Sequence, residues 1–111
     1  MDWPDDADGD VLRRMQESGF DFDREAEIDF NIDFSHWPLS QEEVNQVKKI
    51  YPYSEIIDPT EEDKADGMET GYVQFTIQEK LTYELVINTQ EKVTKQMHNI
   101  GGWCESWGAF H

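Results

Sequence analysis

The sequence has few basic residues and almost no cysteine. Nine Lys and Arg stand against 25 Asp and Glu, which gives a formal net charge of −16. Because phosphate binding relies on Lys and Arg, this balance disfavours direct binding to nucleic acid or to anionic membranes. Cys104 is the single cysteine, so we expect a packing residue in a reducing compartment. No apolar run approaches the ~20 residues of a membrane span and no secretion signal opens the chain, so we expect a soluble cytoplasmic protein.

Motifs that carry catalysis or bind cofactors are also missing. The pair Gly101-Gly102 follows a predicted helix instead of opening one, so it does not make a phosphate-binding loop. Asp29 and Asp33 would lie about 13 Å apart on an extended strand, too far to share a metal ion. The acidic segment 58–69 lacks the ligand order of a calcium loop. No histidine stands at metal-ligand spacing to another candidate ligand: His36, His98 and His111. We therefore expect no cofactor, no metal and no catalytic residue.

The acidic residues are concentrated in two parts of the chain. Residues 1–34 hold twelve Asp and Glu, and residues 55–69 hold seven. Residues 1–9 have no apolar periodicity and are expected to form a mobile acidic arm, followed by a single domain over 10–111. Such a charge distribution favours binding to a basic protein segment. The alternative is that the charge serves solubility alone.

Hydrophobic periodicity and capping residues predict a short first helix followed by a β-α-β-β-α-β order. Period-two alternation predicts strands at 27–35 and 72–80. Two further strands are expected at 53–58, before Pro59, and at 103–110, after the glycine pair. Helices are predicted from an Asp10 cap to Gly19, from a Ser40 capping box to Pro52, and from a Thr82 cap to Gly101-Gly102. The stretch 59–71 is expected to be a surface loop. The order predicts an α+β, ferredoxin-like fold: a four-stranded antiparallel sheet with an extra N-terminal helix.

One face of this sheet is expected to be polar, and it is either solvated, covered by the first helix or used for binding. Asp29 and Asp33 alternate with apolar residues in the first strand. In the last strand, regular alternation would place Trp103, Glu105 and Trp107 on one face, and Cys104, Ser106 and Phe110 on the other. We expect one indole to complete the core and the other to shield a sheet edge or the first helix. The alternative is that an exposed indole beside Glu105 anchors a basic peptide.

Three short motifs give the chain a family resemblance. They are Gly19-Phe20-Asp21-Phe22, Ile28-Asp29-Phe30, and Gly101-Gly102 followed by Trp107-Gly108. In order and spacing they resemble the regulator of ribonuclease E activity B family of small acidic bacterial proteins, over about residues 9 to 111. The chain departs from the family pattern at Cys104-Glu105-Ser106, where Tyr, Asp and Gly are usual. The resemblance implies a ferredoxin-like domain that binds an RNA-degrading endonuclease and lowers its activity without acting on RNA itself. The charge is compatible with this, because an acidic surface can occupy Arg-rich regions of such a nuclease.

The leading hypothesis is therefore a non-enzymatic acidic regulator that binds a basic protein partner, such as a ribonuclease assembly. One alternative is an immunity-type protein that neutralises a basic toxin nuclease, and another is a small ferredoxin-like enzyme with a pocket on the polar sheet face. We expect a monomer or a weak dimer. The candidate partner-binding residues, some of them motif positions carried over from the resemblance, are Asp21, Asp29, Asp33, Trp103, Glu105 and Trp107.

Overall fold

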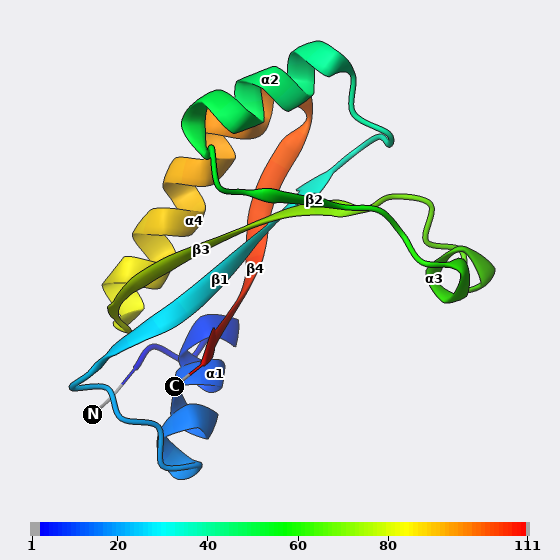
Figure 1. Cartoon of the computed structure of the whole chain (residues 1–111). Helices are drawn as coiled ribbons and strands as arrows, with labels where there is room; N and C mark the ends of the chain where they lie inside the picture. Colours follow the sequence, from blue (N-terminus) through cyan, green and yellow to red (C-terminus); the bar gives the residue numbers. More distant parts are fainter. Residues whose placement is uncertain (1–2, 111) are drawn as a thin grey trace.

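The computed structural model describes residues 3–110 as a four-stranded antiparallel sheet with helices on one side (Figure 1). The strands follow the order β2-β3-β1-β4 across the sheet. The predicted α+β class and the predicted succession of strands and helices after the first helix are both present. The elements are α1 (Ala7–Glu17), β1 (Glu25–Phe34), α2 (Gln41–Ile50), β2 (Glu55–Ile57), α3 (Glu61–Ala65), β3 (Tyr72–Lys80), α4 (Tyr83–Met97), the 3-10 turn η1 (His98–Ile100) and β4 (Gly102–Phe110).

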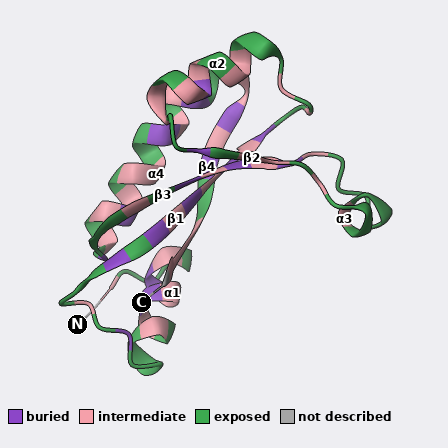
Figure 2. Cartoon of the chain, viewed as in Figure 1, coloured by how far each residue is buried: buried purple, intermediate pink, exposed green. Residues whose placement is uncertain are grey.

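Strand β1 lies at the centre and carries the core. Every second side chain of it is buried (Figure 2), and Ile28, Phe30 and Ile32 are fully shielded from solvent. Helices α2 and α4 cover this apolar face with Val47 and with the residues Val86, Val93 and Met97. Each large side chain buried in this way stabilises the fold by about 1.5–3 kcal/mol.

Local capping residues set the starts of α2 and α4 as predicted, whereas α4 gives way to η1 before the glycine pair at which it was expected to end. Ser40 accepts a hydrogen bond from the Glu43 backbone while the Glu43 carboxylate accepts one from Ser40, which completes the capping box. Thr82 caps α4 by accepting from the Leu85 backbone. The chain leaves η1 at Gly101, whose φ of 76° lies in the left-handed region that favours glycine.

Helix α1 begins earlier than predicted. Its cap is Asp6, whose carboxylate accepts from Gly9 N at 2.7 Å, and Asp10 instead lies within the helix and pairs with Arg13. Ala7 to Gly9 are therefore helical, although they were expected to belong to the acidic arm. Trp3 packs on Phe22 with ring centroids 5.5 Å apart. The division into an arm over 1–9 and a domain over 10–111 stays a prediction, and Met1 and Asp2 lie outside the described residues.

The stretch expected to be a plain surface loop contains the short helix α3. Thr60 and Asp63 form a second capping box there, a pattern that the sequence interpretation overlooked. No residue of α3 is buried, and the helix stands away from the sheet (Figures 1 and 2). Strand β2 is correspondingly short, and only Glu55, Ile56 and Ile57 pair with β3.

A β-bulge in β4 overturns the predicted facing of its side chains. Ser106 pairs with Asn31, but the next pair along β1 is Ile32 with Cys104, so Glu105 is an extra residue. The extra residue shifts the alternation by one position. Trp107 therefore lies on the core face beside Phe30, whereas Trp103 lies on the polar face beside Asp33. The expected placement of both indoles on one face was wrong, and the side chain of Phe110 lies outside the described residues.

We predict that Gly102→Ala destabilises the fold and that Gly108→Ala does not, although both glycines lie in β4. A methyl group on Gly102 would lie 2.8 Å from Phe34 Cε1 and 2.9 Å from Met97 Cβ, whereas one on Gly108 meets nothing within 4 Å. The overpacking should lower the free energy of unfolding by about 1–3 kcal/mol. Urea denaturation checks this, and equal midpoints for the two variants would contradict it.

Candidate partner-binding face

The face of the sheet opposite the helices is polar and acidic; we call it the open face. The strand register assigns its members, because residues paired across neighbouring strands point to the same side. Five carboxylates lie on it, and the only lysine lies at the far end opposite Glu25. The open face consists of Glu25, Glu27, Asp29, Asn31, Asp33, Glu55, Ile57, Tyr72, Gln74, Thr76, Gln78, Lys80, Trp103, Ser106 and Gly108.

A ladder of side-chain hydrogen bonds crosses the middle of the open face. Gln74 donates to Asn31 Oδ1 at 3.0 Å, and Asn31 donates in turn to Ser106 Oγ at 2.9 Å. Thr76 donates to Asp29. Within residues 3–110 these side chains bond to one another and to no helix. The ladder thus lies on a polar surface that α1, α2 and α4 leave uncovered.

Three of the predicted partner-binding residues meet at one end of this face. Asp33 pairs in register with Trp103 on β4 and with Tyr72 on β3, and the bulge residue Glu105 lies close enough to act on it electrostatically. Burial, and then the negative charge of Glu105, raise the pKa of Asp33 above its usual value. A partly desolvated carboxylate beside a second one therefore occupies this end, and no cation among residues 3–110 pairs with it.

Trp107 takes a structural position on the other side of the sheet. Its indole N–H donates to Asp8 Oδ1 at 2.8 Å, and its ring packs against the core. A second bond, from the Tyr83 hydroxyl to Asp6 at 2.6 Å, joins the start of α1 to α4. Trp107 is thus part of the attachment of α1 and does not lie with the other candidates. Sequence spacing alone contained no signal for the bulge that separates them.

Asp21 is also separate from the cluster at Asp33. It lies in the loop before β1, where it accepts from the Asp23 backbone at 3.0 Å and pairs with Arg24 at 3.4 Å. The span from Glu25 to Asp33 along β1 is about 26 Å at roughly 3.3 Å per residue. Asp21 therefore stabilises its own turn. Asp29 lies at the middle of β1 and shares the open face with Asp33.

One contact at the edge of the fold was missed in the sequence. His36 Nε2 lies 2.7 Å from Glu43 Oε2, seven positions apart along the chain. Hydrogen bonding from the Ser40 backbone, followed by that from His36, lowers the pKa of Glu43. The carboxylate is thus already used by the α2 capping box. His98 makes no such pair in the described part of the chain, and His111 lies outside it.

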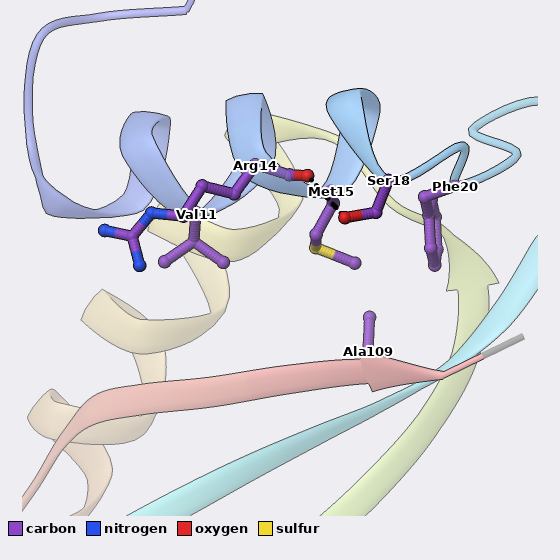
Figure 3. Close-up of a pocket in the computed structure, with 6 residues that line it drawn as sticks. All are labelled: Val11, Arg14, Met15, Ser18, Phe20 and Ala109. Carbon is purple, nitrogen blue, oxygen red and sulfur yellow. Dashed lines mark hydrogen bonds between the residues drawn. The ribbon is translucent and has the colours of Figure 1, made fainter.

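A shallow pocket of about 260 Å³ lies between α1 and β4 (Figure 3). Val11 and Met15 of α1 point toward Ala109 across it, and Phe20 closes one end. Its only ionisable side chain is Arg14, so the pocket offers no pair of acid and base. It lies on the core side of the sheet, because Ala109 pairs with Ile28, and not on the open face where an enzyme site was considered.

Residues 3–110 contain no cluster of three or more His, Cys, Asp or Glu side chains able to hold a metal ion. The described helices are all too short or too polar to cross a membrane. Cys104 is buried on the core face, and burial is the main cause that raises its pKa to about 12. It is therefore a packing residue, as expected.

The family of the chain follows from its match to a family model. The model of regulator of ribonuclease activity B, RraB, matches residues 5–109. The chain belongs to this family. No curated protein matches the sequence. RraB proteins are regulators of ribonuclease activity, and the matched range includes both the bulged strand and the open face of the present member.

We predict that Cys104 reacts very slowly with Ellman's reagent in the native protein. A pKa of about 12 in place of 9.0 lowers the thiolate fraction at pH 9 from about one half to about one in a thousand. The native rate should be at least about 100-fold below the rate in 8 M urea, where the thiol is exposed. Similar rates in both conditions would show that the thiol is accessible.

We predict that Tyr83→Phe reduces the loss of stability at alkaline pH. The bond to Asp6 raises the pKa of Tyr83 from 10.0 to about 12. Because the folded pKa is the higher one, the neutral hydroxyl stabilises the fold fully below pH 10, and this contribution disappears as pH rises toward 12. Urea midpoints between pH 9.5 and 11.5 should fall less steeply than in wild type, and Tyr53→Phe, at a side chain 96% exposed, is the control. Parallel curves for all three proteins would contradict it.

Proposed function

We propose that this chain is a non-enzymatic regulator that binds a basic segment of a ribonuclease E-type RNA-degrading assembly and lowers its activity. The open face is the contact surface. The observation that carries the proposal is the charge of this face, where Glu25, Glu27, Asp29, Asp33 and Glu55 stand against Lys80 alone.

The physical case rests on charge and on exposure. A surface of one sign raises the rate of encounter with a segment of the opposite sign and selects against acidic partners. RNA carries the same sign as the open face, so the regulator acts on the protein and not on the substrate. The bond from Thr76 holds the Asp29 carboxylate in place on this face, which lowers the entropy cost of binding at that position.

The family match favours ribonuclease regulation over neutralisation of a toxin nuclease. An enzymatic role has less support, because the pocket at α1 lacks an acid–base pair and Cys104 is buried with a raised pKa. The β-α-β-β-α-β order and the fully antiparallel pairing favour a ferredoxin-like arrangement for the domain. We further propose that the protein acts in the cytoplasm as a monomer or a weak dimer.

The test is an RNA-cleavage assay with the purified ribonuclease E-type assembly of the source organism. Wild type should lower the cleavage rate. The double variant Glu27→Gln/Asp29→Asn should inhibit about three- to tenfold more weakly, because two carboxylates of the open face are neutralised. Glu61→Gln/Glu62→Gln on the outlying helix α3 removes the same charge and should inhibit like wild type.

Two results would contradict the proposal in different ways. Absence of inhibition by wild type at any molar ratio would remove the regulatory function. An equal loss in both double variants would assign the effect to overall charge and not to the open face.

A further inference from the structure

We propose that Tyr72, Asp33 and Trp103, with Glu105 beside them, form a receptor for one arginine side chain of the basic partner segment. We call these four residues the arginine receptor. The inference rests on the proposed function, which it extends from a charged face to a defined point of contact.

The strand register places an acidic side chain between two aromatic ones. Asp33 on the central strand faces Tyr72 on β3 and Trp103 on β4. Side chains paired across antiparallel strands have Cβ atoms about 4.5–5.5 Å apart, so the three form one continuous row. A cation seated on Asp33 would contact an aromatic ring on each side.

Trp103 differs from the other tryptophans in having no internal partner among the described residues. The indole N–H of Trp37 donates to Asp58 at 2.9 Å, and that of Trp107 donates to Asp8. Trp3 stacks on Phe22. All three pack against the core, whereas Trp103 does not. Its half-buried side chain lies on the open face of the sheet, where a bound segment can contact it.

Asp33 likewise has no hydrogen-bond or ion-pair partner within residues 3–110, whereas Asp29 on the same strand has one. Asp29 accepts a hydrogen bond from Thr76. Asp33 accepts none and pairs with no cation within residues 3–110, although it is partly buried. A carboxylate that is desolvated but unpaired gains more from an incoming cation than a solvated one does. Neutralising Asp33 would also relieve its repulsion by Glu105.

The chemistry of the row favours arginine over lysine. A guanidinium is planar, so it can stack on an indole or phenol ring while its N–H groups reach two carboxylates. Asp33 and Glu105 supply those carboxylates from different strands. The ammonium group of lysine is a compact point charge and cannot stack on the rings in this way. The bulge is essential, because it turns Trp103 toward Asp33 and away from the core.

The test measures the binding of two fluorescent peptides by anisotropy at about 50 mM salt. One peptide consists of four Gly-Ser-Arg repeats and the other of four Gly-Ser-Lys repeats. The arginine peptide should bind wild type more tightly than the lysine peptide. Asp33→Asn should weaken arginine-peptide binding about tenfold, as loss of a charge-assisted hydrogen bond does. Trp103→Ala should weaken it about two- to fivefold, and Trp103→Phe less.

Glu27→Gln is the matched control, because it removes one exposed carboxylate from the same face and strand. As one carboxylate of the contact surface it should weaken binding about two- to threefold, clearly less than Asp33→Asn does. Chemical shifts of the Trp103 and Trp107 indole N–H groups in NMR spectra add a second readout, and only that of Trp103 should move with the arginine peptide. Urea midpoints check that each variant is folded.

The possible outcomes distinguish a failure of the arginine receptor from a failure of the proposed function on which it rests. If Asp33→Asn and Glu27→Gln weaken binding equally, or if both peptides bind alike, the arginine receptor is wrong while an acidic contact face stands. If wild type binds neither peptide yet inhibits the ribonuclease, the receptor is again wrong. If Asp33→Asn weakens binding clearly more than Glu27→Gln does and the Trp103 signal moves, the receptor is supported whatever the cleavage assay gives.

Discussion

The two-residue period of β1 is the constraint on which the other features depend. Because β1 is flanked by a strand on each side, its alternate side chains define both faces of the sheet: a core beneath Ile28, Phe30 and Ile32, and an acidic surface along Asp29 and Asp33. A shift of one residue in its pairing would move every apolar side chain into solvent. The burial of the apolar half therefore also fixes the positions of the carboxylates. Core and binding face are two results of one register.

Local patterns allowed much of the fold to be predicted. Strand β3 has the predicted bounds, and the capping residues Ser40 and Thr82 start α2 and α4 as expected. These features depend on residues close together in the chain, so local sequence patterns are sufficient to predict them. The predicted start of α1 at Asp10 was wrong, since the helix is capped by Asp6. The packing of Trp3 and the bonds from Asp6 and Asp8 favour the earlier start.

The candidate site was harder to predict, because its geometry depends on pairing between distant strands. Asp33 and Glu105 were both candidates, but only the register places them together, and it adds Tyr72, which no local pattern marked. The bulge at Glu105 is a property of two strands and not of one. It separates Trp103 from Trp107. The pair of His36 with Glu43 was missed for a similar reason, since the turn between them brings them together only in the folded chain.

The extra residue in β4 also affects how relatives should be compared. Between Gly102 and Trp107 the chain has four residues, and one of them is the bulge. In a homologue of the same length that lacks the bulge, regular alternation would turn the earlier aromatic position inward, whereas one residue fewer without a bulge would keep it on the open face. Two aligned tryptophans could then have opposite surroundings despite identical letters. For this strand, the number of residues in the segment must therefore be compared between relatives as carefully as their identities.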